Sequence, residues 1–188
     1  MAEQFLTLMA DLDEESQSRM SSWYKELQNA GFDGEQTHGL PFHISLACYS
    51  LDREAEVKDL VHRLAEDFAQ VPVYISHVGI FPGGKVLFGA PDMSPELLAL
   101  HDASVEVESI QDFIWTPHVT MIIDEPDVIA KALPLFAKSF APFGGKIVRL
   151  HLCAFWPTRE IITIQLKELQ KVVLNTSLSR AVQSEMTM

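Results

Sequence analysis

Two short segments of the chain combine a histidine with a hydroxyl residue two positions later: His43-Ile44-Ser45 and His118-Val119-Thr120. On a β-strand, residues i and i+2 point to the same side, so each histidine would share a face with its hydroxyl. The opposite faces would be apolar, built from Phe42, Ile44, Leu46 and Cys48 in the first segment and from Val119, Met121 and Ile123 in the second. The spacing therefore predicts two strands that each present one imidazole and one hydroxyl on a face separate from the core.

Two imidazoles and two hydroxyls suit the cleavage of a phosphoester. An imidazole has an ordinary pKa near 6.5, so one histidine can accept a proton from water while the other donates a proton to the leaving oxygen. The hydroxyls of Ser45 and Thr120 would donate hydrogen bonds to the non-bridging phosphate oxygens. We expect no metal and no cofactor, because neither segment carries a carboxylate beside its histidine and the chain lacks a Cys-x-x-Cys pair.

The two segments occupy equivalent places in an internal repeat. Adding 75 to the residue numbers of His43 and Ser45 gives His118 and Thr120, and the same offset takes Phe81-Pro82 to Trp156-Pro157. The repeat predicts two strand, helix, strand, strand units at about 42–91 and 117–167, related by a pseudo-twofold arrangement that would bring both polar pairs to one cleft. A chance match at this offset is the alternative.

Hydrophobic periodicity supplies the elements around these segments. Apolar residues at helical spacing predict helices over 20–27, ending at Gly31, over 57–68 and over 129–140, and Ser94 with Pro95 predicts a fourth helix over 94–110. Strands are expected at 5–9, 42–49, 73–81, 85–89, 118–123, 146–156 and 160–166. Strands and helices alternate along the chain and then finish in hairpins, which indicates the α/β class.

Composition limits the partners. The 188 residues carry 14 Lys plus Arg against 26 Asp plus Glu, a formal net charge of −12, so the surface would repel extended DNA or RNA while a small anion in a pocket remains acceptable. No apolar run is long enough to span a membrane, and two cysteines provide no disulfide framework, so we expect a cytoplasmic protein. One domain is expected over 1–168, followed by a helix or tail over 169–188; the oligomeric state stays open.

The paired segments resemble the two His-x-Thr/Ser-x motifs of the 2H phosphoesterase superfamily, which includes 2′-5′ RNA ligases and 2′,3′-cyclic nucleotide phosphodiesterases. Trp115-Thr116-Pro117-His118 is similar to the family's approach to its second motif, and Arg149-Leu150-His151-Leu152-Cys153 resembles a strand of the cyclic phosphodiesterases. The likeness covers residues from Phe5 to Leu166. The chain departs from the family where Phe42 replaces a common Pro and where Ser45 replaces the commoner Thr.

The resemblance implies a bilobal α/β fold of the α+β type, with two mainly antiparallel sheets, helices outside and a cleft between the two lobes. It also implies hydrolysis of a cyclic phosphate, such as a 2′,3′-cyclic nucleotide, the cyclic phosphate at an RNA end formed in RNA processing, or ADP-ribose 1″,2″-cyclic phosphate. It implies that His43 and His118 are the catalytic acid/base pair and that Ser45 and Thr120 bind the phosphate; which histidine plays which role stays open. Trp115 could stack on a nucleobase or be a core residue flanking the strand.

Three alternatives stay open at this stage. The cleft could belong to a non-catalytic module that binds a nucleotide or a phosphorylated ligand, and the two segments could also be ordinary strands of a structural protein. Lys85 and Arg159, near two hairpin tips, could attract a second phosphate or be solvated.

Cys48 and Cys153 are expected to be buried small residues, and His77 and His151 to be packing or surface residues.

Overall fold

The computed structural model describes residues 4–34, 39–110 and 114–169. Its elements, in chain order, are β1 (Phe5–Leu12), α1 (Glu14–Asn29), β2 (His43–Ser50), the short 3-10 helix η1 (Leu51–Arg53), α2 (Glu54–Asp67), β3 (Val71–Ile80), β4 (Val86–Pro91), α3 (Pro95–Ser104), β5 (Val119–Ile123), α4 (Pro126–Ser139), β6 (Phe143–Phe155) and β7 (Arg159–Gln165).

The strands form one seven-stranded sheet in the order β2-β1-β6-β3-β4-β5, with β7 paired to β6, and every pairing between these strands is antiparallel. The predicted α/β class with antiparallel strands is confirmed. The sheet is continuous rather than split in two, because Val71–Ile75 of β3 pair with Phe143–Ile147 of β6 and join its two ends. The bilobal organisation and the duplication stay predictions.

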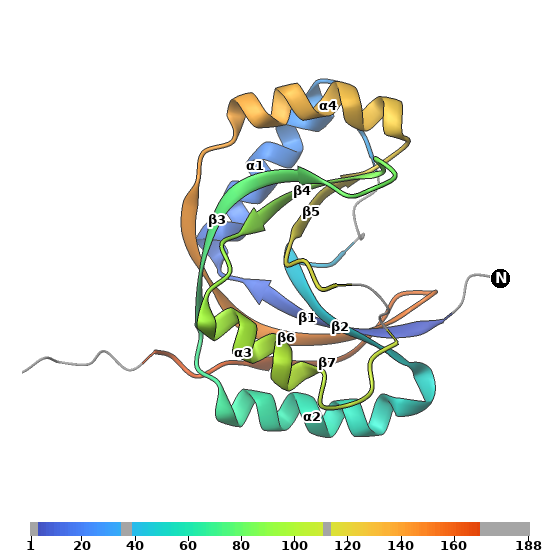
Figure 1. The fold of residues 1–188 in the computed structure, drawn as a ribbon, viewed down its shortest axis with the longest axis vertical. Helices are drawn as coiled ribbons and strands as arrows, with labels where there is room; N and C mark the ends of the chain where they lie inside the picture. Colours follow the sequence, from blue (N-terminus) through green and yellow to red (C-terminus); the bar gives the residue numbers. More distant parts are fainter. Residues whose placement is uncertain (1–3, 35–38, 111–113, 170–188) are drawn as a thin grey trace, which may run out of the picture.

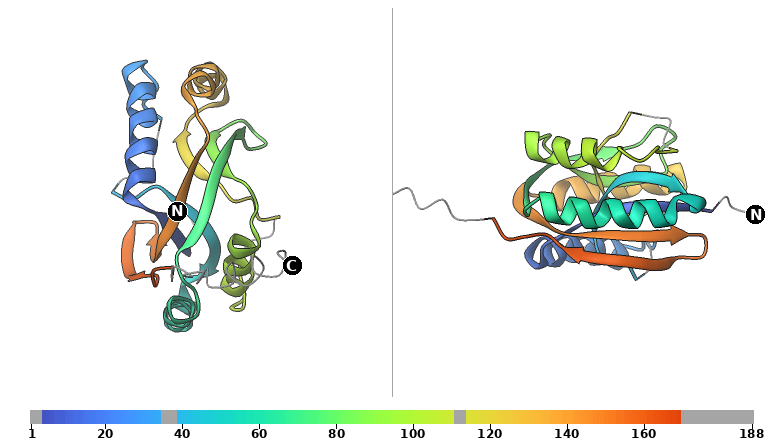
Figure 2. Two further views of the ribbon diagram at one scale, coloured as in Figure 1. Left: turned by 90° about the vertical axis from the view of Figure 1, so that its left-hand side faces the viewer. Right: turned by 90° about the horizontal axis from the view of Figure 1, so that it is seen from below.

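The sheet curves strongly, so that its two terminal strands, β2 and β5, come into contact (Figure 1). Helices α1 and α4 pack together near the β4 and β5 end, while α2 and α3 pack side by side near β2, β6 and β7 (Figures 1 and 2). The helices thus lie outside the curved sheet, and the residues of the candidate site lie on its inner face. No helix in the described ranges is long and apolar enough to cross a membrane.

The helices form where their apolar stripes and caps predict. Asp13 caps α1 by accepting a hydrogen bond from the Ser16 N–H at 2.9 Å, and Ser94 caps α3 by accepting one from the Leu97 N–H at 3.1 Å. The stripes of three helices are buried: Met20, Trp23 and Leu27 in α1; Val57, Leu60, Val61 and Leu64 in α2; Ile129, Ala132 and Phe136 in α4. Satisfied caps and buried stripes together hold these helices against the sheet.

Helix α3 is shorter than predicted, since it ends at Ser104 rather than near Ile110. The residues after α3 form hydrogen bonds to the edge strand β2 instead. The Ile110 N–H and the Ser109 hydroxyl both donate to the Cys48 carbonyl, at 2.9 and 3.0 Å. These bonds satisfy an edge-strand carbonyl that a continued helix would leave without a protein partner. Of the predicted terminal helix or tail, all but Leu169 lies outside the described residues.

The two faces of β1 carry different chemistry. Leu6, Leu8, Ala10 and Leu12 enter the main hydrophobic core beneath the helices. On the other face, Met9 packs with Cys153 and Phe155 in a small second cluster that also includes Phe5 and Leu40. This second cluster forms the floor of the inner face, and Cys153 is buried there as predicted.

Candidate active site

Three of the four predicted site residues line one cavity of about 190 Å³ on the inner face of the sheet. His43 and Ser45 come from β2 and Thr120 from β5, and the rest of the lining is Phe5, Thr7, Met9, Ile123, Phe155 and Trp156. His118 lines a second, largely apolar cavity of about 540 Å³ with Phe81, Pro82, Ile114 and Thr116. The pKa of His43 is lowered chiefly by desolvation, and the charge of His118 makes only the smallest contribution to that lowering.

The two histidines are held in the same way. Nδ1 of His43 lies 2.8 Å from the Pro41 carbonyl oxygen, and Nδ1 of His118 lies 2.8 Å from the Thr116 carbonyl oxygen. A carbonyl can only accept, so each Nδ1 must carry the proton and donate it. Each Nε2 is therefore the ring nitrogen that can accept or return a proton.

Burial shifts both histidines toward the neutral form. Desolvation lowers the pKa of His43, against the raising effects of its bond to the Pro41 carbonyl and of the Asp11 carboxylate. Desolvation also lowers the pKa of His118, opposed by its bond to the Thr116 carbonyl. Neutral imidazoles with a bare Nε2 are the state that a general base needs at neutral pH, and a bound phosphate would favour protonation of either ring.

Both motif strands contain a β-bulge directly after the hydroxyl residue. Leu46 is the extra residue of β2, since Ser45 pairs with Met9 and Ala47 with Leu8. Met121 is the extra residue of β5, since Thr120 pairs with Phe88 and Ile122 with Leu87. A bulge inverts the alternation of side chains beyond it.

The bulges correct two predicted positions. Cys48 is predicted to be buried on the apolar face of its strand, but it is only partly buried and lies on the inner face, where Thr7 Oγ1 is 3.6 Å from its sulfur. Ile123 was also expected on an apolar face, but it is 40% exposed and lines the cavity with His43. Strict period-2 reasoning fails at both residues because the extra residue shifts them to the other face.

Trp115 braces the first motif strand. Its indole Nε1–H donates to the Ser45 carbonyl at 2.9 Å, and its ring stacks on the His101 imidazole with centroids 3.9 Å apart. Nδ1 of His101 in turn lies 3.0 Å from the carbonyl oxygen of the bulged Leu46. Trp115 also packs against the main hydrophobic core, in line with the alternative that it is a core residue flanking the strand. Base stacking by Trp115 stays a prediction.

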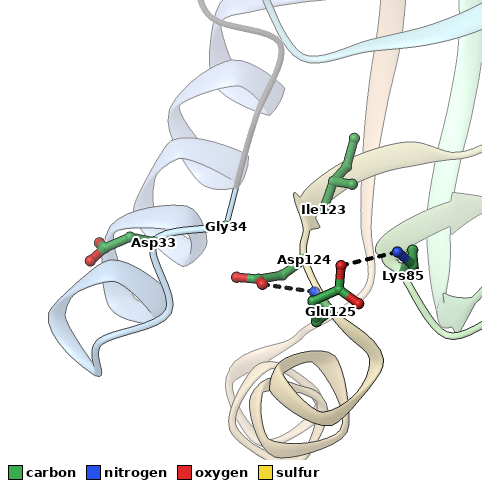
Figure 3. A pocket seen from close by; sticks show the side chains of 6 residues that line it. All are labelled: Asp33, Gly34, Lys85, Ile123, Asp124 and Glu125. Carbon is green, nitrogen blue, oxygen red and sulfur yellow. Dashed lines mark hydrogen bonds and ion pairs between the residues drawn. The ribbon is translucent and has the colours of Figure 1, made fainter.

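The two predicted phosphate-attracting cations have carboxylate partners. Lys85 Nζ lies 3.0 Å from Glu125 Oε1 in a cavity of about 360 Å³ that Asp33 and Asp124 also line (Figure 3). Arg159 Nη2 lies 2.6 Å from Glu54 Oε2. Both pairs are exposed, and neither cation lines the cavity of His43.

Sequence reasoning missed several neighbours of the site. Trp156, 52% exposed, lines the cavity with His43, and its equivalence to Phe81 in the repeat was the only available signal. Asp11, Arg149 and His151 form a charged cluster next to His43. The i, i+2 spacing places Arg149 and His151 on one face of their strand, but nothing in the sequence predicts that Asp11 meets them. Within the described ranges, no group of three or more His, Cys, Asp or Glu is arranged to hold a metal ion.

A family model identifies the class to which this chain belongs, the 2H phosphoesterases. A family model described as the 2′-5′ RNA ligase superfamily matches residues 13–155. The chain belongs to this superfamily, which confirms the resemblance seen in its motifs and supports a phosphoesterase- or ligase-type enzyme.

Solved structures share the fold at low sequence identity. The E. coli LigT structure complexed with 3′-AMP is 17% identical with a TM-score of 0.59, and covers 88% of this chain and 99% of its own. The protein TT0787 of Thermus thermophilus is 16% identical with a TM-score of 0.62, and covers 87% of this chain and 98% of its own. No curated protein gives a significant sequence match.

Proposed function

We propose that the protein is a metal-independent phosphoesterase that hydrolyses a cyclic phosphate by two-histidine acid/base catalysis. The observation that carries the proposal is the matched pair of imidazoles, His43 and His118, each anchored through Nδ1 to the carbonyl two residues before it. Ser45 and Thr120 line the same cavity as His43. These groups supply an acid, a base and two hydroxyls without further partners.

The reaction needs two proton transfers. Nε2 of one histidine removes a proton from water as the water oxygen forms a bond to phosphorus. The phosphorus–oxygen bond of the cyclic ester then breaks, and Nε2 of the other histidine, protonated beforehand, gives its proton to the departing ribose oxygen. The hydroxyls of Ser45 and Thr120 donate to the non-bridging oxygens and orient the phosphorus between the imidazoles. Because both transfers are made by imidazoles, no step requires a metal ion.

A small substrate fits the electrostatics of the chain better than an extended one. The net charge of −12 opposes the approach of long RNA outside the site, while a single nucleotide brings little charge. LigT structures have been obtained with 3′-AMP, with ATP and with NADP+, which is consistent with small nucleotide ligands for this fold. The proposed substrates are 2′,3′-cyclic nucleotides, cyclic phosphates at RNA ends and ADP-ribose 1″,2″-cyclic phosphate.

The proposal is tested by hydrolysis of 2′,3′-cyclic mononucleotides and ADP-ribose 1″,2″-cyclic phosphate in excess EDTA. We expect turnover by the wild type and by His62→Ala, a control that removes an exposed histidine of α2, and loss of turnover in His118→Ala. Loss of wild-type turnover in EDTA would contradict the metal-independent mechanism. Binding of nucleotides without turnover of any ester would instead favour a non-catalytic binding module.

A further inference from the structure

A separate cavity of about 240 Å³ lies beside His43 on the inner face of the sheet. It is lined by Asp11, Gly39, Pro41, Arg149, His151, Glu160 and Thr163. Two contacts connect it to the proposed active site: Asp11 is the register partner of His43 across β1 and β2, and the Pro41 carbonyl accepts the His43 Nδ1–H. Neighbouring strands lie about 4.8 Å apart, so this cavity begins within one or two strand spacings of the catalytic imidazole.

The floor of this cavity is a group of three charged side chains, of which Asp11 and His151 are buried. Oδ2 of Asp11 lies 3.3 Å from Arg149 Nε and 3.5 Å from His151 Nδ1, and Asp11 is only 1% exposed. Neither carboxylate oxygen, nor Arg149 Nε, nor His151 Nδ1 makes a hydrogen bond in the described structure. Buried polar atoms without hydrogen bonds are uncommon in folded proteins. Three of these atoms, Asp11 Oδ2, Arg149 Nε and His151 Nδ1, are held together by ion pairing instead.

The group carries a net positive charge at neutral pH. Desolvation would lower the pKa of His151, but its contacts with the Asp11 carboxylate and with Cys153, whose sulfur lies 3.3 Å from Nε2, raise the pKa to about 10. His151 is therefore a cation at pH 7, as Arg149 is, and the two face a single buried carboxylate. Glu160 also lines this cavity, 3.5 Å from His151 Nε2, so the four charges of the cavity balance and the positive charge is concentrated on Arg149 and His151.

Arg149 is placed to bind an anion. Asp11 holds it at Nε, and its side chain is 31% exposed, which leaves the two Nη nitrogens without a carboxylate partner among the described residues. A guanidinium held in this way can offer a planar fork of N–H groups to a phosphate. The Thr163 hydroxyl lines the same cavity. The volume corresponds to roughly eight water molecules at about 30 Å³ each, which is enough for a phosphate group with part of its hydration.

We propose that this cavity binds a second phosphate of the substrate; this inference rests on the proposed function. The second phosphate lies on the 5′ side of the nucleotide whose cyclic phosphate reacts at His43 and His118. One ribose ring separates the two phosphates, which matches the short step from His43 to Arg149 across β1. The second phosphate is either a terminal 5′-phosphate or the phosphodiester that links the preceding nucleotide. The Glu160 carboxylate, 3.5 Å from His151 Nε2 and 64% exposed, lies at the rim and opposes the anion there.

The test compares kcat/KM for three esters: adenosine 2′,3′-cyclic phosphate, the same ester with a 5′-phosphate, and the dinucleotide ApA that ends in a 2′,3′-cyclic phosphate. We expect the wild type to prefer an ester with a second phosphate by about 10-fold, the effect of one charge-assisted hydrogen bond. Preference for the 5′-phosphate identifies a terminal phosphate, and preference for ApA identifies the internucleotide linkage. Equal values for all three would overturn the proposal.

Variants assign the preference to this cavity. Arg149→Gln should bring the ratio of the preferred ester to the simple ester to about one, while Arg149→Lys should retain part of it because the charge stays. Glu160→Gln should raise the ratio by removing the opposing carboxylate. Arg63→Gln, which removes a cation from the exposed outer surface of α2, should leave the ratio as in the wild type. An unchanged ratio in a folded Arg149→Gln protein, as judged by circular dichroism, would refute the site.

Failure of the proposed hydrolysis can be told apart from failure of this site. If no ester is turned over, the proposed function is wrong, and the site is then measured by titration calorimetry with 3′-AMP and adenosine 3′,5′-bisphosphate. About 10-fold tighter binding of the bisphosphate by the wild type, lost in Arg149→Gln, would support the second-phosphate site by itself. Equal dissociation constants for the two ligands would reject it.

Discussion

The two motif histidines have the same local structure and different neighbours. His43 lies beside a buried charged group on β1 and β6, formed by Asp11, Arg149 and His151. His118 instead lies against two aromatic rings, with centroid distances of 4.6 Å to Phe81 and 5.4 Å to Phe88. The anchoring carbonyl and the bulge are common to both, so the motif itself fixes where Nε2 and the hydroxyl lie.

The neighbouring strand decides what surrounds each imidazole. Met9 of β1 pairs with Ser45, and Phe88 of β4 occupies the same register position opposite Thr120. Phe88 fits because the next strand offers Gly79: a Cβ there would lie 2.4 Å from the Phe88 ring. One motif can therefore serve two different environments, polar on the His43 side and aromatic on the His118 side, within a single sheet.

The largest expected effect concerns what the two histidines share. His43→Ala and His118→Ala should each reduce kcat/KM for the cyclic ester by about 10²- to 10⁴-fold, because each removes one acid/base partner. His62→Ala is the control in the same assay. A variant of either motif histidine with wild-type turnover would show that the two positions are not functionally matched, despite their common anchoring.

The charged group should make the stability of the protein pH-dependent. The pKa of His151 is raised to about 10 in the folded protein, so its stabilising contribution is fully present below about 6.5 and is lost as the pH rises toward 10. Where the folded state binds one proton more than the unfolded state, the free energy of unfolding falls by about 1.4 kcal/mol for each pH unit. Urea unfolding of wild type between pH 6.5 and 10 should show this fall.

The matching variants isolate His151 from other titrating groups. His151→Gln should show a shallower fall in unfolding free energy over the same range, while His77→Gln, on an exposed part of β3, should follow the wild type. Parallel curves for wild type and His151→Gln would mean that the buried group does not hold His151 in its charged form.

The aromatic surroundings of His118 are tested by adding a side chain at Gly79, next to the Phe88 ring. Gly79→Ala should displace the Phe88 ring and its contact with His118, with a loss of about 1–3 kcal/mol in the free energy of unfolding, as for overpacking in a core. Gly144→Ala is the matched control, since a Cβ there would meet only Tyr74 at 4.0 Å. Equal stability of the two variants would show that Phe88 has room to move.

The smallest effect concerns the brace on β2. Trp115→Phe keeps an aromatic ring against His101 but removes the Nε1–H donated to the Ser45 carbonyl, so we expect a loss of about 0.5–1.5 kcal/mol in the free energy of unfolding. Trp156→Phe, at a half-exposed tryptophan, should change the stability by less. A larger loss of stability in Trp156→Phe than in Trp115→Phe would show that the hydrogen bond of Trp115 is not the contact that braces β2.

Local patterns predicted the elements and the motif faces well. The stripes of α1, α2 and α4 and the cap of α3 follow from periods and residue types that act within one or two turns. Phe68 and Phe140, expected at the ends of two stripes, instead stand just past α2 and α4 as extended C-cap residues. Such end effects depend on where the chain must turn toward its next strand.

By itself, the sequence determined that two strands each pair an imidazole with a hydroxyl, because a strand repeats every two residues and the motif lies before each bulge. It also determined the family, whose model matches residues 13–155. Only the tertiary structure decided what stands next to each histidine. Asp11, His43, Arg149 and His151 meet because β1 lies between β2 and β6. This strand order is set by packing between segments that are far apart along the chain, more than 100 residues in the case of β1 and β6, rather than by any local pattern.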